Sequence, residues 1–305
     1  MISAGRIRAR CAGAIVLSFL CGCPPPAGPR GPVVSSVPRE ARQIVDVVQA
    51  NAAQLDQALW SSTISVTARF KDGQGKPHVY NLEGNMLFRK PRDLRIDLRH
   101  GLTDRVMGIG SNAEDYWVWV EPEMGSMRWG RHRNAGRACA EKIAVRPDQL
   151  AAVLGFGGLP ESPGELIGPG RKFGREFDIL SYWKASKDGR TLGLDREYFV
   201  DRTSPFLVRL VVFYDEFGRR VMSALLDDYR AAWPEGPLVA HSINIAWPQD
   251  DGIFTLRAER IEGRTTVSPK AFDRPTQAVL PGGVREIIQI DADCDKTASS
   301  SPADR

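Results

Sequence analysis

The chain has 305 residues, of which 42% are hydrophobic and 26% are charged. This composition supplies enough apolar surface for a core, and it excludes a disordered, a collagen-like and a polytopic membrane protein. The formal net charge is +4, from 41 basic and 37 acidic residues. Three arginines lie in a segment that we expect to be removed, and 41 minus 3 leaves 38 basic residues, or +1. A nearly neutral chain has no basic footprint for nucleic acid.

Residues 1–22 are typical of a secretory signal peptide. The first ten contain Arg6, Arg8 and Arg10 and no acidic residue, and an apolar run from Cys11 to Leu20 follows. Ten helical residues rise about 15 Å, which is too short for a hydrocarbon core of about 30 Å. The segment is therefore predicted to direct export and not to span a membrane.

The signal peptide ends in Leu20-Cys21-Gly22-Cys23, which resembles the bacterial lipobox. The resemblance implies that the chain is cut before Cys23 and that Cys23 carries diacylglycerol, so that it anchors the protein to a membrane. Asp does not follow Cys23 directly, and the proteobacterial sorting rule then implies the periplasmic face of the outer membrane. The alternative is an ordinary signal peptide with incidental cysteines.

Residues 23–38 are predicted to be a tether, because their prolines and glycines favour extended geometry over packing. At about 3 Å per residue, the stretch 24–38 reaches about 45 Å. We find no internal repeat and no strong boundary further on, so residues 39–292 are predicted to form one domain. Residues 293–305 form a Ser- and Asp-containing tail with nothing to bury.

Two cysteines remain after cleavage and lipidation, Cys139 and Cys294. In an exported protein two thiols can form one disulfide, which here closes a loop of 155 residues (294 minus 139). The loop-entropy estimate for such a bond is about 5 kcal/mol. Two separate buried thiols are the alternative.

Hydrophobic periodicity predicts one helix followed by many strands. Apolar residues recur at helical spacing from Pro38 to Trp60, and the period then changes to two. Two strands joined by a Gly-containing turn read as a hairpin over residues 60–89, and Leu94, Ile96 and Leu98 then alternate with charged residues. Further strands are predicted at Arg105–Ile109, Tyr116–Val120, Ser126–Arg131, Phe173–Trp183, Thr191–Asp201, Phe206–Asp215, Arg219–Tyr229, Leu238–Trp247 and Ile253–Glu262.

This pattern predicts a mainly β fold with few helices, built on one curved antiparallel sheet whose charged face meets water. A short helix is expected from Pro147 to Phe156, with Leu150, Val153 and Leu154 on one side. The stretch Gly155–Arg171 that follows is rich in glycine and proline, and it is expected to be a loop or a lid.

Motifs for catalysis, metals and cofactors are absent from the sequence. The four histidines, His78, His100, His132 and His241, have no second ligand at metal-binding spacing. Acidic pairs such as Asp227-Asp228 point to opposite faces of a strand. We therefore expect no enzymatic activity, no metal and no cofactor, and a hydrolytic site assembled from distant residues is the alternative.

Four segments together resemble the LolA/LolB family of lipoprotein-localisation proteins. They follow one another in the family's order: Gly84–Asp97, Ser111–Pro122, Pro205–Gly218 and Ala271–Pro275. The resemblance implies an unclosed half-barrel of about eleven strands, lidded by helices, that accepts acyl chains and hands over lipidated proteins without a cofactor. The family's lid-holding arginine is replaced here by Lys90, and extra length falls at Cys139–Arg171. Because Lys cannot form the bidentate contacts of Arg, Lys90 is not expected to hold a lid.

The leading hypothesis is a lipoprotein that binds an acyl chain, a lipid or a lipoprotein in an apolar cavity. Its partners are then a lipid and the membrane that holds Cys23, while the oligomeric state stays open. The alternative is an envelope scaffold or sensor that binds a protein and has a filled interior. Candidate wall residues of the cavity are Leu94, Ile96, Leu98, Met107, Ile109, Trp117, Trp119, Val208 and Leu210.

Overall fold

The computed structural model describes residues 39–71, 74–101, 105–121, 125–135, 137, 139–140, 143, 147–154, 156, 158–160, 166–185 and 189–294. The chain divides into two compact units, Met1–Ser36 and Val37–Arg305, and all described residues belong to the second. The predicted signal peptide, Cys23, the tether and the tail beyond Cys294 lie outside the described residues. Asp293 and Cys294 themselves are described, and Cys294 is buried.

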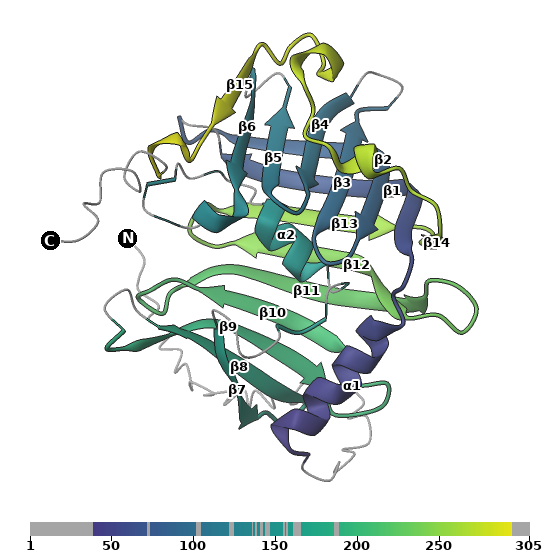
Figure 1. Cartoon of the computed structure of the whole chain (residues 1–305), viewed down its shortest axis with the longest axis vertical. Helices are drawn as coiled ribbons and strands as arrows, with labels where there is room; N and C mark the ends of the chain where they lie inside the picture. Colours follow the sequence, from purple (N-terminus) through teal and green to yellow (C-terminus); the bar gives the residue numbers. More distant parts are fainter. Residues whose placement is uncertain are drawn as a thin grey trace, which may run out of the picture. The chain divides into compact units, whose positions relative to one another are not determined.

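The described strands form one large sheet that is mainly antiparallel and does not close (Figure 1). Its order is β15-β6-β5-β4-β3-β2-β1-β13-β12-β11-β10-β9-β8-β7, and β14 pairs with β1 beside this path. Only β15 runs parallel to its neighbour, β6, among these pairs. The bounds are β1 Ala58–Lys71, β2 Pro77–Arg89, β3 Asp93–Arg99, β4 Arg105–Ser111, β5 Asp115–Val120, β6 Ser126–Arg131, β7 Leu166–Phe173, β8 Phe177–Ala185, β9 Leu192–Asp201, β10 Val208–Tyr214, β11 Arg220–Ala231, β12 Leu238–Trp247, β13 Gly252–Ala258, β14 Glu262–Arg264 and β15 Glu286–Gln289.

The expectation of about eleven strands is wrong, because the described residues alone form a sheet of fifteen strands. The predicted strand Phe173–Trp183 is interrupted by a tight turn in which the Gly174 amide donates to the Phe177 carbonyl, 2.9 Å away. The two sides of this turn are β7 and β8, so residues 166–171 belong to a strand and not to a loop. Likewise Ile253–Glu262 divides into β13 and β14, and β15 forms only by pairing with the distant β6.

Two helices cover one face of the sheet, which we call the interior face. Helix α1 spans Ala41–Ala53, shorter than the predicted helix, and buries Ile44, Val48 and Ala52. Helix α2 spans Pro147–Val153 and contacts β4 and β5. Buried apolar residues from both helices and from both halves of the sheet belong to one continuous core cluster, which defines the interior face.

The opposite, outer face of β1 to β6 is covered by the C-terminal segment 267–284, which includes the short helices Pro269–Phe272 and Gln277–Val279. Arg95 Nη1 donates to the Ala271 carbonyl at 3.2 Å, and Arg105 Nη2 donates to the Val279 carbonyl at 2.9 Å. The charged side of β3, expected to meet water, therefore binds this segment.

Candidate functional site

The interior face of β3 and β4 carries five of the nine predicted wall residues. In the antiparallel register Ile96 lies opposite Ile109, and Leu98 lies opposite Met107, so these side chains share one face. Leu94, Leu98 and Met107 have no accessible surface. All five belong to the interior core cluster: Leu94, Ile96, Leu98, Met107 and Ile109.

The two predicted tryptophans lie on the outer face instead. Trp117 pairs with Gly110 and Trp119 pairs with Gly108, so neither shares a face with Ile109. A Cβ at Gly108 would lie 2.3 Å from the Trp119 ring, and one at Gly110 would lie 2.2 Å from the Trp117 ring. The indoles therefore pack flat over these glycines, in a small cluster with Met127 and Val284.

The last two predicted wall residues are also separated. Val208 is partly buried against the interior core. Leu210 lies opposite Phe199 on one neighbouring strand and opposite Leu225 on the other, so the three side chains share a face of the sheet. Leu225 is 52% exposed, so this is the outer face. The structure thus brings six of the nine residues to the interior core and leaves Trp117, Trp119 and Leu210 outside it.

Helix α1 is attached to the rest of the domain by a few polar contacts along its length. Gln49 Nε2 donates to the Leu159 carbonyl at 2.8 Å. Asn51 exchanges two hydrogen bonds with the backbone of Leu238 at the start of β12, each 2.9 Å long. Before the helix, Arg39 pairs with the buried Asp178 at 3.5 Å. Amide contacts such as those of Gln49 and Asn51 leave no periodic signal in the sequence, and sequence reasoning missed them.

Lys90 forms a hydrogen bond with the C-terminal end of the same helix. Its Nζ donates to the Ala52 carbonyl in the last turn of α1, at 2.7 Å. The helix dipole favours a cation at this end, and a single carbonyl needs only one donor, so the bidentate geometry of Arg is not required. A cavity of about 260 Å³ lies beside this contact, and Arg89, Lys90, Arg264 and Asp56 are among its lining residues.

The covered face is closed in this structure. A side chain lining a water-sized cavity would keep accessible surface, and Leu94, Leu98 and Met107 keep none. Leu150 and Val153 of α2 are also fully buried. Access for any ligand to these side chains therefore requires movement of the elements that cover them.

Among the described residues, no group of three His, Cys, Asp or Glu side chains could hold a metal ion. One serine and one histidine do meet, since Ser111 Oγ lies 3.1 Å from His132 Nε2. The same nitrogen lies 3.0 Å from the Asn112 carbonyl, which can only accept, so Nε2 carries the proton. Ser111 is fully buried, and a protonated Nε2 cannot activate it as a base.

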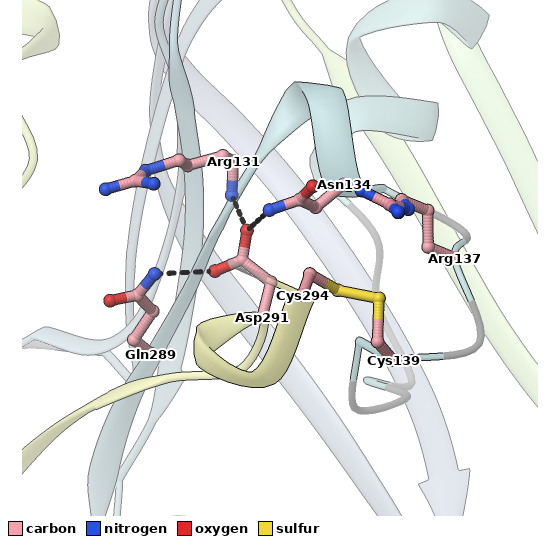
Figure 2. Close-up of a disulfide and its surroundings, with 7 residues drawn as sticks. All are labelled: Arg131, Asn134, Arg137, Cys139, Gln289, Asp291 and Cys294. Carbon is pink, nitrogen blue, oxygen red and sulfur yellow. Dashed lines mark hydrogen bonds between the residues drawn. A yellow bond between two sulfur atoms is a disulfide. The ribbon is translucent and has the colours of Figure 1, made fainter. Parts of the chain in front are cut away.

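Cys139 and Cys294 form a disulfide that ties the chain after β15 to the chain after β6 (Figure 2). Beside it, the buried Asp291 accepts from the Arg131 amide at 3.0 Å, from Asn134 Nδ2 at 2.8 Å and from Gln289 Nε2 at 2.9 Å. Burial by itself raises the pKa of Asp291. The hydrogen bonds lower it by more than burial raises it, so the pKa of Asp291 lies below its usual value. The two features fix β15 at the sheet edge.

No protein-family model matches the chain, and no curated protein does. Among solved structures, a DUF1329 family protein from Desulfovibrio piger is 15% identical over 79% of this chain and 98% of its own, with a TM-score of 0.48. A putative outer membrane lipoprotein-sorting protein domain from Vibrio parahaemolyticus is 13% identical over 77% and 97%, with a TM-score of 0.48. A LolA superfamily protein from Nitrosomonas europaea is 14% identical over 78% and 99%, with a TM-score of 0.45.

One further observation concerns membranes: within the part of the chain that the structure describes, none of the helices has the length and apolar character needed to cross a bilayer.

Proposed function

We propose that this chain is a lipoprotein, anchored through Cys23 at the periplasmic face of the outer membrane, that binds an acyl chain, a lipid or a lipoprotein. Its role would be lipoprotein sorting or envelope lipid handling. The observation that carries the proposal is an aliphatic interior core to which helix α1 contributes Ile44 and Val48, while a few polar contacts hold this helix in place. The sequence resemblance to the LolA/LolB family supports the same function. Binding of this kind needs no catalytic residue and no cofactor.

The energetics of the helical cover favour exchange for a ligand. Helix α1 buries Ile44, Val48 and Ala52 and packs Ala41 and Val45 partly against the core. Burial of each of the two larger buried side chains, Ile44 and Val48, contributes about 1.5–3 kcal/mol. An acyl chain of about 15 methylenes contributes about 0.8 kcal/mol for each, or about 12 kcal/mol in total. An acyl chain that took the place of α1 would therefore offset both the apolar contacts and the few hydrogen bonds that the helix loses.

A second candidate function is an envelope scaffold that binds a protein partner. Two observations favour it: the interior side chains have no accessible surface, and the outer face carries an apolar row in which Leu210 lies between Phe199 and Leu225. A scaffold would use such a surface with its core permanently filled.

The deciding experiment uses the chain from Ser36 to Arg305, purified without detergent. We expect lipid to co-purify in native mass spectrometry, and we expect oleate to displace an apolar dye with saturation. Replacing Lys90 with Met removes a charge-assisted hydrogen bond on α1, so dye uptake should be about tenfold faster.

The matched control is Lys71→Met, which removes a lysine from a surface ion pair with Asp251 and should leave dye uptake unchanged. A protein that carries no lipid, and that takes up no dye even with Lys90→Met, would overturn the proposal in favour of the scaffold. Cross-linking would then be needed to find the protein partner.

A further inference from the structure

The sheet splits beside the start of β12. The last residue pair between β12 and β13 is Ser242 with Arg257. After β13 the chain turns away from β12, and β14 pairs with β1 at Ala58 to Trp60. The residues of β12 before Ser242 therefore lack a ladder partner on this side. A pocket of about 500 Å³ lies in this split.

The pocket has an apolar wall, a charged rim and one buried polar group. Ala232, Trp233 and Ile261 supply apolar surface, and Ala232 and Ile261 also belong to the interior core. The complete lining is Arg230, Ala231, Ala232, Trp233, Pro234, His241, Glu259, Arg260, Ile261, Glu262 and Gly263. Its two arginines and two glutamates balance, so the pocket does not select an ionic ligand by net charge.

The rim arginines already have partners. Arg230 contacts both carboxylate oxygens of Asp228, at 2.9 and 2.5 Å, and also donates to the Glu259 carbonyl at 3.2 Å. Arg260 pairs with Glu262 at 2.9 Å. A ligand anion would have to compete with these carboxylates, so the rim favours a neutral polar group.

His241 supplies the specific feature. It is 3% exposed, and its Nδ1 lies 3.0 Å from the Ala258 carbonyl. A carbonyl only accepts, so Nδ1 carries the proton, and in the neutral ring Nε2 is then a hydrogen-bond acceptor. Nε2 has almost no accessible surface and no hydrogen-bond partner among the described residues, so a ligand donor reaches it only when the side chains around it move. A buried acceptor left unpaired costs about 1–3 kcal/mol, which a donor group would recover.

We propose that this pocket binds the polar end of a neutral amphipathic ligand, whose hydroxyl or amide N–H donates to His241 Nε2. The adjoining carbons of the ligand contact Ala232, Trp233 and Ile261. A lipid glycerol and an N-acylated peptide both offer this chemistry, which is a neutral donor next to an acyl chain. Extension of that chain into the interior core rests on the proposed function, but recognition of the polar end does not.

The experiment uses three short probes that share a butyryl group: monobutyrin with hydroxyls, N-methylbutyramide with an amide N–H, and methyl butyrate with no donor. The purified full chain is labelled with ¹⁵N at its four histidines, and the His241 Nε2 resonance is followed during titration. We expect the two donors to shift this resonance and to bind about fivefold more tightly than methyl butyrate, as one net hydrogen bond predicts. The stronger of the two donors identifies the lipid or the peptide source.

Replacing His241 with Phe should abolish the fivefold preference, and His100→Phe, the same change at an exposed histidine, should preserve it. The resonance shift in the unaltered chain tests the proposal even if His241→Phe fails to fold. If no probe moves the resonance, or if methyl butyrate moves it equally, the proposal is overturned. Because the probes are too short to replace α1, a positive result with no dye uptake would overturn the proposed function alone.

Discussion

At the scale of single residues, Asp291 is the buried charge with the clearest role. Three donors converge on its carboxylate, and two of them share Oδ2. An Asn side chain presents an NH₂ group to at least one of these donors, so Asp291→Asn should lower the free energy of unfolding by about 1–3 kcal/mol in urea titrations at pH 7. The control is Asp250→Asn at an exposed position. Equal stability of the two variants would contradict this role.

The lowered pKa of Asp291 also sets the sign of a pH dependence. A carboxyl whose pKa is lower in the folded than in the unfolded state stabilises the fold above its unfolded pKa, about 4, and loses this contribution as the pH falls through the folded pKa. The stability difference between the unaltered chain and Asp291→Asn should therefore shrink below about pH 4. A difference that stays constant from pH 7 to pH 3 would be inconsistent with this ionisation.

At the scale of elements, the contact between β4 and β5 depends on two glycines. A methyl group at Gly108 or Gly110 would lie within 2.3 Å of an indole, so Gly108→Ala and Gly110→Ala must displace Trp119 or Trp117. Overpacking of this kind costs about 1–3 kcal/mol and should lower the melting temperature. Gly193→Ala in β9 is the control, because a Cβ there meets no atom within 4 Å. Tryptophan fluorescence that changed equally in all three variants would refute the packing argument.

At the scale of the whole molecule, the disulfide joins residues 155 positions apart and holds residues 285–294, which include the edge strand β15, beside β6. Replacing Cys139 and Cys294 with Ser should cost about 2–5 kcal/mol in urea titrations and make stability independent of reductant. Hydrogen exchange at the Arg285 and Ile290 amides, which bond to Gly125 and Trp129, should also accelerate. Unchanged protection of these amides would show that the segment is held without the disulfide.

The sequence by itself determined that the protein is mainly β, with one helix before the strands. Alternation such as Leu94, Ile96 and Leu98 is a local property of an extended chain, and each strand shows it independently. The strand predictions failed where local pattern does not decide. Strand β15 exists only through its parallel pairing with β6, and the turn at Gly174 divides the predicted strand Phe173–Trp183 between β7 and β8.

Only the tertiary structure decided which side of each strand lies in the interior. A period of two defines two faces without saying which one meets the helices, so Ile109 and Trp117 looked equally suitable as cavity wall. The register assigns Ile109 to the interior, and segment 267–284 then covers the tryptophans. The environment of His241 was also decided by the tertiary structure. Its buried acceptor lies where the pairing of β12 with β13 ends, and such long-range strand pairing cannot be seen in the local sequence pattern.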